Sequence, residues 1–99
     1  MKRTHYIYAL VCPIDKTIKY IGLSVNPSAR AKAHNSLNDG SPDKIEWLSN
    51  LREKKLKPSY IILGKEPTKF RGRIMEETFI EEYAKAGHPL FNSKMNPSR

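Results

Sequence analysis

The chain has 99 residues, a length typical of one small domain with a modest hydrophobic core. Its 18 Lys and Arg residues outnumber its 10 Asp and Glu residues, and a formal net charge of +8 favours a polyanionic partner, most often nucleic acid, over plain basic surfaces. A single cysteine excludes a disulfide framework and a cysteine zinc site. No apolar run approaches the ~20 residues of a membrane span, and no signal-peptide core follows the basic N-terminus. We therefore expect a cytoplasmic protein of one domain, residues 1–99.

The N-terminal third of the chain predicts a β-hairpin followed by a helix. Residues 5–12 are rich in β-branched and aromatic side chains, residues 13–16 interrupt this pattern, and residues 17–22 resume it. The connection is longer than a tight two-residue turn. Asn26 and Pro27 then suit the cap and first position of a helix that ends near residue 35. Arg30 and His34 are four residues apart in this helix and share one face.

The middle of the chain predicts a loop, a second helix and a third strand. Residues 38–40, Asn-Asp-Gly, indicate the loop. Ser41 and Pro42 then begin a short amphipathic helix that extends to about residue 55. The apolar run 60–63, ended by Gly64, indicates a short strand that is central in the sheet or otherwise well covered.

The last helix is predicted from about residue 68 or 69 to Ala86, with Gly87 as its C-terminal stop. One face carries the residues of an apolar stripe, Gly72, Met75, Phe79, Ile80 and Tyr83. A second face carries a solvated ladder at four-residue spacing, Glu77, Glu81 and Lys85. Glu76 falls within the apolar stripe. A carboxylate there must lie near a rim, pair with Arg30 or a lysine, or bind a cation.

Two tyrosine motifs, Tyr6-Ile7-Tyr8 and Tyr20-Ile21-Gly22, resemble the paired motifs of the GIY-YIG endonuclease superfamily. The first motif departs from the family pattern because Tyr6 stands where the family has glycine. The tyrosines that match the motifs are Tyr8 and Tyr20. Four further family positions match in the same order along the chain: Arg30, His34, Glu76 (rather than Glu77) and Asn92. This ordered set is much more specific than either tyrosine motif alone.

The resemblance implies a small α/β domain of the α+β kind, in which a three-stranded, mostly antiparallel sheet is flanked by about three helices. It also implies an enzyme, a divalent-metal-dependent endonuclease that hydrolyses DNA phosphodiester bonds. Such a nuclease is free-standing or comes from a phage or mobile element. The implied metal is Mg²⁺ or Mn²⁺ held by Glu76, since one carboxylate, waters and phosphate oxygens suffice as ligands.

The resemblance also implies a role for each matched residue. Tyr8 is the first choice for the general base toward water, Tyr20 orients water or phosphate, and Arg30 forks two hydrogen bonds onto a phosphate. The other implied roles are proton transfer or phosphate contact for His34, support of the active site for Gly22 and Asn92, and DNA contact for Lys19, Ser24 and Lys32. Leu23 stands where some relatives carry a lysine.

Each of these residues also has a purely structural interpretation. Both tyrosines suit ordinary packing on a sheet, His34 suits a helix surface, and Lys19 suits a strand edge. Two other functions therefore remain open at this point: an inactive nucleic-acid-binding module of the same fold, and a plain basic interaction protein. No helix-turn-helix, zinc finger or long basic tail is present to recognise bases. A homodimer, a partner protein or the structure of the DNA would then supply specificity.

Overall fold

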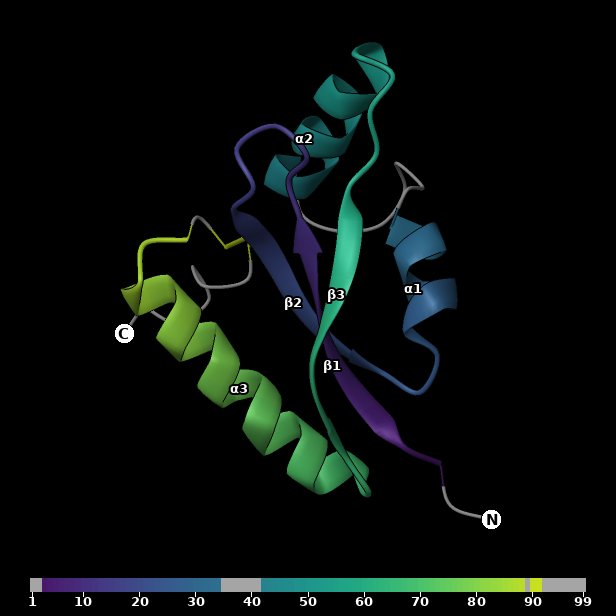
Figure 1. Cartoon of the computed structure of the whole chain (residues 1–99), viewed down its shortest axis with the longest axis vertical. Coiled ribbons are helices and arrows are strands. Elements are labelled where there is room, and N and C mark those ends of the chain that lie inside the picture. Colours follow the sequence, from purple (N-terminus) through teal and green to yellow (C-terminus); the bar gives the residue numbers. More distant parts are fainter. Residues whose placement is uncertain (1–2, 35–41, 89, 92–99) are drawn as a thin grey trace.

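A computed structural model of the chain describes residues 3–34, 42–88 and 90–91, with the backbone alone described at 31–34. Its elements follow the order β1 (His5–Val11), β2 (Ile18–Ser24), α1 (Pro27–His34), α2 (Pro42–Glu53), β3 (Ser59–Glu66) and α3 (Lys69–Lys85) (Figure 1). The predicted α+β fold, a three-stranded antiparallel sheet with three helices, is confirmed for the part of the chain described.

The central strand of the sheet is β1. The strand order is β2-β1-β3, and β1 pairs antiparallel with both neighbours. Tyr8 lies opposite Gly22 of β2 on one side and opposite Ile62 of β3 on the other. Because β1 is covered by strands at both edges and by helices on its faces, all four residues from Ile7 to Leu10 are buried.

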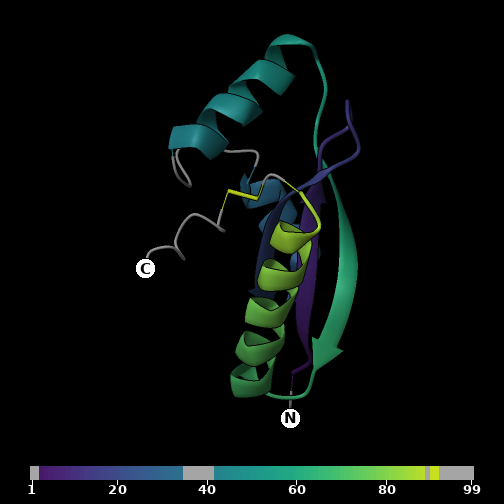
Figure 2. The same ribbon diagram turned by 90° about the vertical axis from the view of Figure 1, so that its left-hand side faces the viewer.

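Side chains alternate along β1, so its two faces serve different parts of the molecule. Ile7 and Ala9 belong to the main hydrophobic core, which β2 and Leu90 complete. The stripe of α3 packs on this core through the residues predicted for it, Met75, Phe79, Ile80 and Tyr83. Figures 1 and 2 show α3 on this face of the strands and α1 on the opposite face. The predicted orientation of α3 is therefore confirmed.

The prediction of a central or well-covered third strand was wrong. β3 is an edge strand, and Tyr60, Ile61 and Ile62 are 39%, 44% and 46% exposed. Nor does Gly64 end the strand, which continues to Glu66. A short apolar run indicates a strand but carries no information on its place in the sheet, and β1 has the longer run of buried residues that the centre requires.

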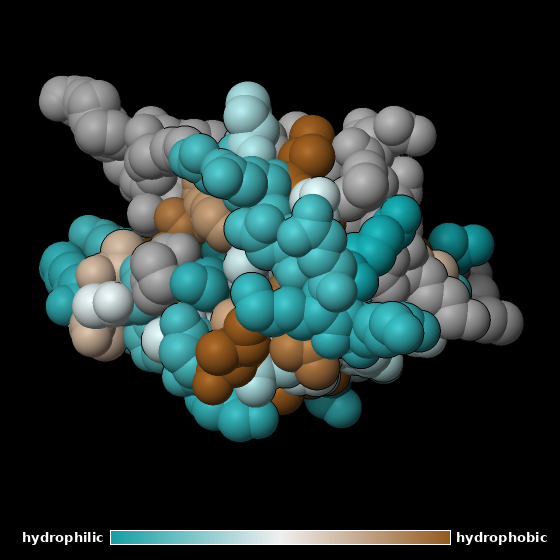
Figure 3. Space-filling model, turned by 90° about the horizontal axis from the view of Figure 1, so that it is seen from above, coloured by the Kyte–Doolittle hydropathy of each residue, from teal (hydrophilic) through white to brown (hydrophobic). Residues whose placement is uncertain are grey.

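Helix α2 covers one end of the sheet, at the top of Figure 1. It buries Leu48 and Leu51, and Trp47 stacks obliquely on Phe91 with ring centroids 5.5 Å apart. Figure 3 looks down on this end and shows mostly hydrophilic side chains with small apolar patches. Among the helices described, none is long and apolar enough to cross a membrane.

Helix α3 begins and ends near the predicted residues. The Thr68 hydroxyl accepts a hydrogen bond from the Arg71 backbone N–H at 3.2 Å, which caps the first turn. Gly87 adopts the left-handed conformation, with φ of 99°, and stops the helix. On the solvated side, Lys85 pairs with Glu81 at 3.7 Å.

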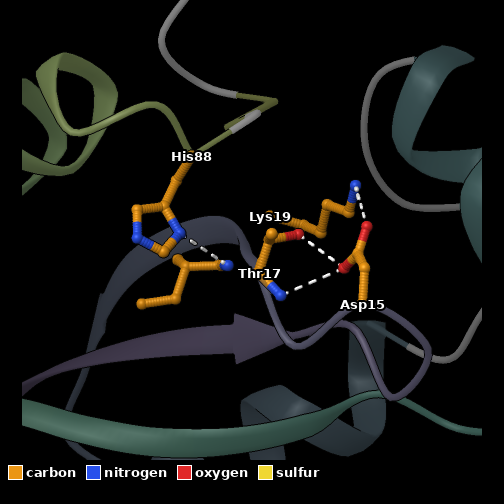
Figure 4. Close-up of polar contacts among 5 residues, drawn as sticks. Asp15, Thr17, Lys19 and His88 are labelled. Atoms are coloured by element: carbon orange, nitrogen blue, oxygen red, sulfur yellow. Dashed lines mark hydrogen bonds and ion pairs between the residues drawn. The ribbon is translucent and has the colours of Figure 1, made fainter.

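The segment after α3 is tied to the start of β2 (Figure 4). The Ile18 backbone N–H donates to Nδ1 of His88 at 3.0 Å, and the Phe91 N–H donates to the Lys19 carbonyl at 2.7 Å. Nearby, the Asp15 carboxylate accepts from the backbone N–H and hydroxyl of Thr17, and these bonds hold the pKa of Asp15 at about 2. The bonds to His88 and from Phe91 give backbone groups at the start of β2 partners that lie outside the sheet.

This tie predicts the effect of His88→Phe. The substitution keeps an aromatic ring for the edge-to-face contact with Tyr83, at 5.2 Å between centroids, but removes the acceptor for the Ile18 N–H. A partly buried donor left unpaired should lower the free energy of unfolding by about 1–3 kcal/mol. Urea unfolding measures this, with His5→Phe as a control outside the tie. An unchanged midpoint for His88→Phe would contradict the assignment of this bond.

Candidate active site

Tyr8 lies directly across Gly22, and the contact leaves no room for a side chain on the glycine. A methyl group at position 22 would lie 2.6 Å from the Tyr8 hydroxyl oxygen and 2.7 Å from its Cζ. Tyr8 is only 1% exposed, so its ring has little freedom to move aside. The glycine of the second motif therefore makes the space in which the tyrosine of the first motif lies.

Tyr8 lines a hollow of about 360 Å³. Strands β1 and β2, the residue that follows β2, helix α1 and helix α3 all contribute to its walls. Ten of the residues described line it: His5, Tyr8, Tyr20, Leu23, Ser24, Val25, Arg30, Lys69, Arg73 and Glu76. Five of them were singled out in the sequence as catalytic or DNA-contacting residues, namely Tyr8, Tyr20, Ser24, Arg30 and Glu76.

Tyr8 interacts with both the second tyrosine and the arginine of the hollow. The Tyr8 and Tyr20 rings are tilted at 48°, with centroids 6.3 Å apart. Arg30 donates a hydrogen bond to the Tyr8 hydroxyl. Burial, and then the neighbouring Tyr20, raises the pKa of Tyr8 to about 12, although the positive charge of Arg30 opposes this.

Glu76 occupies the α3 wall of the hollow and is half-buried, whereas its neighbour Glu77 is exposed. Burial raises the pKa of Glu76, Arg73 opposes the shift, and Glu77 adds to it. Within the described residues, neither Arg30 nor any lysine forms an ion pair with Glu76, so the rim ion pair that the sequence left open finds no partner there. Glu76 thus has the charge of Arg73 nearby but no ion pair with Arg30 or a lysine in the part of the chain described, and a half-buried carboxylate of this kind can serve as a ligand for a further cation.

The donors of the hollow fit a hard divalent cation better than a zinc ion. No group of three or more His, Cys, Asp or Glu residues that could hold a metal occurs in the described ranges. Zinc sites usually need three or four such ligands. Mg²⁺ instead retains waters and is commonly bound by one or two carboxylates together with substrate phosphates. Glu76 facing an open hollow matches that pattern.

The remaining predicted residues are not brought to the hollow or lie beyond what is described. Lys19 does not line the hollow; its ammonium lies 3.7 Å from the Asp15 carboxylate, and its side chain is 15% exposed. The expected DNA contact of Lys19 therefore finds no support in its position. Lys32 and His34 lie in α1, but their side chains are outside the described part, and so is the whole of Asn92.

Several residues near the tyrosines were missed by sequence reasoning. Lys69 and Arg73 precede Glu76 at helical spacing, and that spacing could have shown that they share its face. Lys44 of α2 is only 3% exposed, and its ammonium lies 4.7 Å from the centroid of the Tyr20 ring. This cation–π contact gave no signal in the sequence, because it depends on how α2 packs against the sheet.

Two strands and two helices bring two tyrosines, an arginine and a glutamate to one hollow. The chain is thus a small α+β domain with the residue types of a phosphodiesterase site. The family model of the GIY-YIG catalytic domain matches residues 4–89, and the chain belongs to the GIY-YIG family. The resemblance found in the sequence is thus confirmed. Membership supports a nuclease, a hydrolase whose substrate is DNA. No curated protein and no solved structure matches the chain significantly.

The burial of Tyr8 predicts a late-titrating tyrosine. The chain has five tyrosines, and an ordinary one ionises near pH 10. Absorbance titration of the folded protein should show one component near pH 12 that is absent from Tyr8→Phe. Because the pKa is higher in the folded state, this tyrosine contributes stability below about pH 10 that is lost as the pH rises toward 12. Loss of a component near pH 10 in the variant would contradict the assignment.

Proposed function

We propose that the chain is a divalent-metal-dependent DNA endonuclease that uses a tyrosine-assisted attack of water. The observation that supports this most strongly is the convergence of Tyr8, Tyr20, Arg30 and Glu76 on one open hollow from four different elements. Ordinary sheet packing accounts for neither the arginine hydrogen bond on Tyr8 nor the half-buried glutamate opposite it.

Glu76 would hold the Mg²⁺ or Mn²⁺. When bound, the cation would supply positive charge that offsets the charge developing on the phosphate. Glu76 must be ionised to serve as a ligand. Since burial raises its pKa, acidification should protonate it sooner than an ordinary glutamate, and cation affinity should fall at a correspondingly higher pH.

Tyr8 would act as general base toward the attacking water, and Tyr20 would orient the water or the phosphate. The Tyr8 hydroxyl interacts with Arg30, and the charge of Glu76 also acts on it. A pKa of about 12 is too high for a base near neutral pH, and added positive charge beside the hydroxyl lowers it. Tyr8 would therefore act as a base near neutral pH only when cationic groups surround it. The binding of the cation and the phosphate would in this way control when the base is active.

Arg30 would bind the scissile phosphate. Its planar guanidinium can donate two parallel hydrogen bonds to phosphate oxygens, which lysine cannot reproduce. Ser24 lines the same hollow and would add a contact to the strand. His34 would assist proton transfer or contact phosphate, Lys32 would contact DNA, and Asn92 would support the site.

The role of Glu76 predicts opposite effects of Glu76→Gln on activity and stability. Cleavage of plasmid DNA with Mg²⁺ should fall to the level of an EDTA control, because the neutral amide is a poor cation ligand. Without metal, the melting temperature at neutral pH should equal or exceed that of the wild type, since the raised pKa shows that ionising Glu76 is unfavourable in the fold.

The matched control is Glu77→Gln, which removes the same charge one residue away on the exposed face. It should cleave at nearly the wild-type rate. Equal loss of cleavage in both variants would mean that Glu76 is not the ligand. DNA binding by the wild type without any cleavage would favour the inactive binding module of the same fold.

The two tyrosines are separated by their phenylalanine variants. Tyr8→Phe removes the hydroxyl and keeps the ring that fills the space over Gly22, so the fold should survive while the chemical step slows by about 10²–10⁴-fold. Tyr20→Phe should lose less if it only orients. Single-turnover cleavage at saturating protein measures both, with thermal melts for folding. A slower Tyr20→Phe enzyme at equal stability would reverse the two roles.

A further inference from the structure

Two cationic residues of α3, unlike the other two on this helix, form no ion pair with a described residue. Lys69 and Arg73 are exposed, line the hollow, and have no ion-pair partner among the residues described. By contrast, the intervening Arg71 lies near Glu66 at 3.8 Å. Lys85, at the far end of the same helix, lies near Glu81 at 3.7 Å. The helix thus pairs Arg71 and Lys85 with acids away from the hollow, whereas Lys69 and Arg73 border it together with Glu76, whose charge Arg73 also feels.

Gly72 explains why these cations reach the hollow. It is the buried residue of α3, and a methyl group there would lie 2.8 Å from Cδ1 of Leu23 and 3.5 Å from Cβ of His5. The first turns of α3 therefore lie almost against the ends of β1 and β2. Lys69 and Glu76 lie one turn before and one turn after Gly72 on the same face, and Arg73 lies one turn from each of them; these three residues form one wall of the hollow.

The charges around the hollow favour a polyanion that extends beyond a single phosphate. Arg30 contributes a cation from α1, Lys69 and Arg73 contribute two from α3, and Glu76 is the acid among the lining residues. Four residues of helix separate the two α3 cations by about 6 Å along its axis. Successive phosphates of one strand advance by about 3.4 Å along a duplex, so the pair spans one to two nucleotides.

We propose that Lys69 and Arg73 form a second phosphate-binding subsite, which holds the DNA backbone beside the phosphate bound at Arg30 and Glu76. DNA would then enter along the first two turns of α3. This inference rests on the proposed function, because it assumes that the strand cut at Glu76 is the one held. It assigns a binding task to residues outside the tyrosine motifs.

The test compares two double variants with the same change in net charge. Lys69→Ala/Arg73→Ala removes the two cations of the hollow, and Arg71→Ala/Lys85→Ala removes two that are ion-paired on the same helix. Both are made in the Glu76→Gln background, so that fluorescently labelled duplex DNA is bound but not cut. Fluorescence anisotropy gives the affinity between about 50 and 200 mM salt.

For Lys69→Ala/Arg73→Ala, the hollow variant, we expect the slope of log affinity against log salt concentration to be smaller in magnitude by about 1.8, because two phosphate contacts at about 0.9 each are lost. Its affinity for the duplex should be roughly 10- to 100-fold weaker near 0.1 M salt. The control should keep the slope of its parent. Equal losses in the two variants, no loss in the hollow variant, or no DNA binding by the parent would each overturn the proposal. If alanine destabilises α3 in thermal melts, Lys69→Gln/Arg73→Gln replaces the first variant.

The failure of this subsite and the failure of the proposed function have different signatures. A wild-type protein that does not cleave DNA with Mg²⁺ would contradict the proposed endonuclease, yet the difference between the two double variants would still measure the subsite. A wild-type protein that cleaves, combined with equal binding by both variants, would contradict the subsite alone.

Discussion

The close approach of Tyr8 to Gly22 is the constraint on which the rest of the structure depends. The two residues face each other on adjacent antiparallel strands, and the tyrosine ring fills the place that a side chain at position 22 would take. This allows a large aromatic residue to be buried in the central strand while it still lines a hollow. A bulkier residue at position 22 would move the ring, and with it the hydroxyl that Arg30 contacts.

The burial that stabilises the sheet also determines the electrostatics of the site. Burial is the main reason that the pKa values of both Tyr8 and Glu76 are raised, so their surroundings disfavour negative charge on the two groups proposed to do the chemistry. Cations at the walls oppose this, Arg30 beside Tyr8 and Arg73 beside Glu76. The site is therefore suited to accept further positive charge, and a divalent cation with its phosphate ligand would provide it.

Helix α3 serves the core and the site with different faces. Its apolar stripe closes the core against β1 and β2, and its N-terminal half turns Glu76 and two cations toward the hollow. Gly72 allows the helix to pack on the core and to line the hollow at the same time, because only a residue without a side chain lets the helix approach Leu23 so closely. Lys44 of α2 adds a charge behind Tyr20. The positions of the residues around the hollow, which come from β1, β2, α1 and α3, thus depend on how these elements pack against one another.

The sequence by itself determined most of the local structure and the family. Strand composition predicted β1 and β2, the stop signal of Gly87 predicted the end of α3, and helical phase separated Glu76 from Glu77. These features depend on near neighbours along the chain, which is why they could be predicted. The tertiary structure alone decided that β3 lies at an edge, that Lys19 pairs with Asp15 away from the hollow, and that Lys44, Lys69 and Arg73 surround the site. Strand order and the packing of one helix beside another are set by contacts between residues far apart in sequence, and an apolar run or a lysine carries no local mark of such contacts.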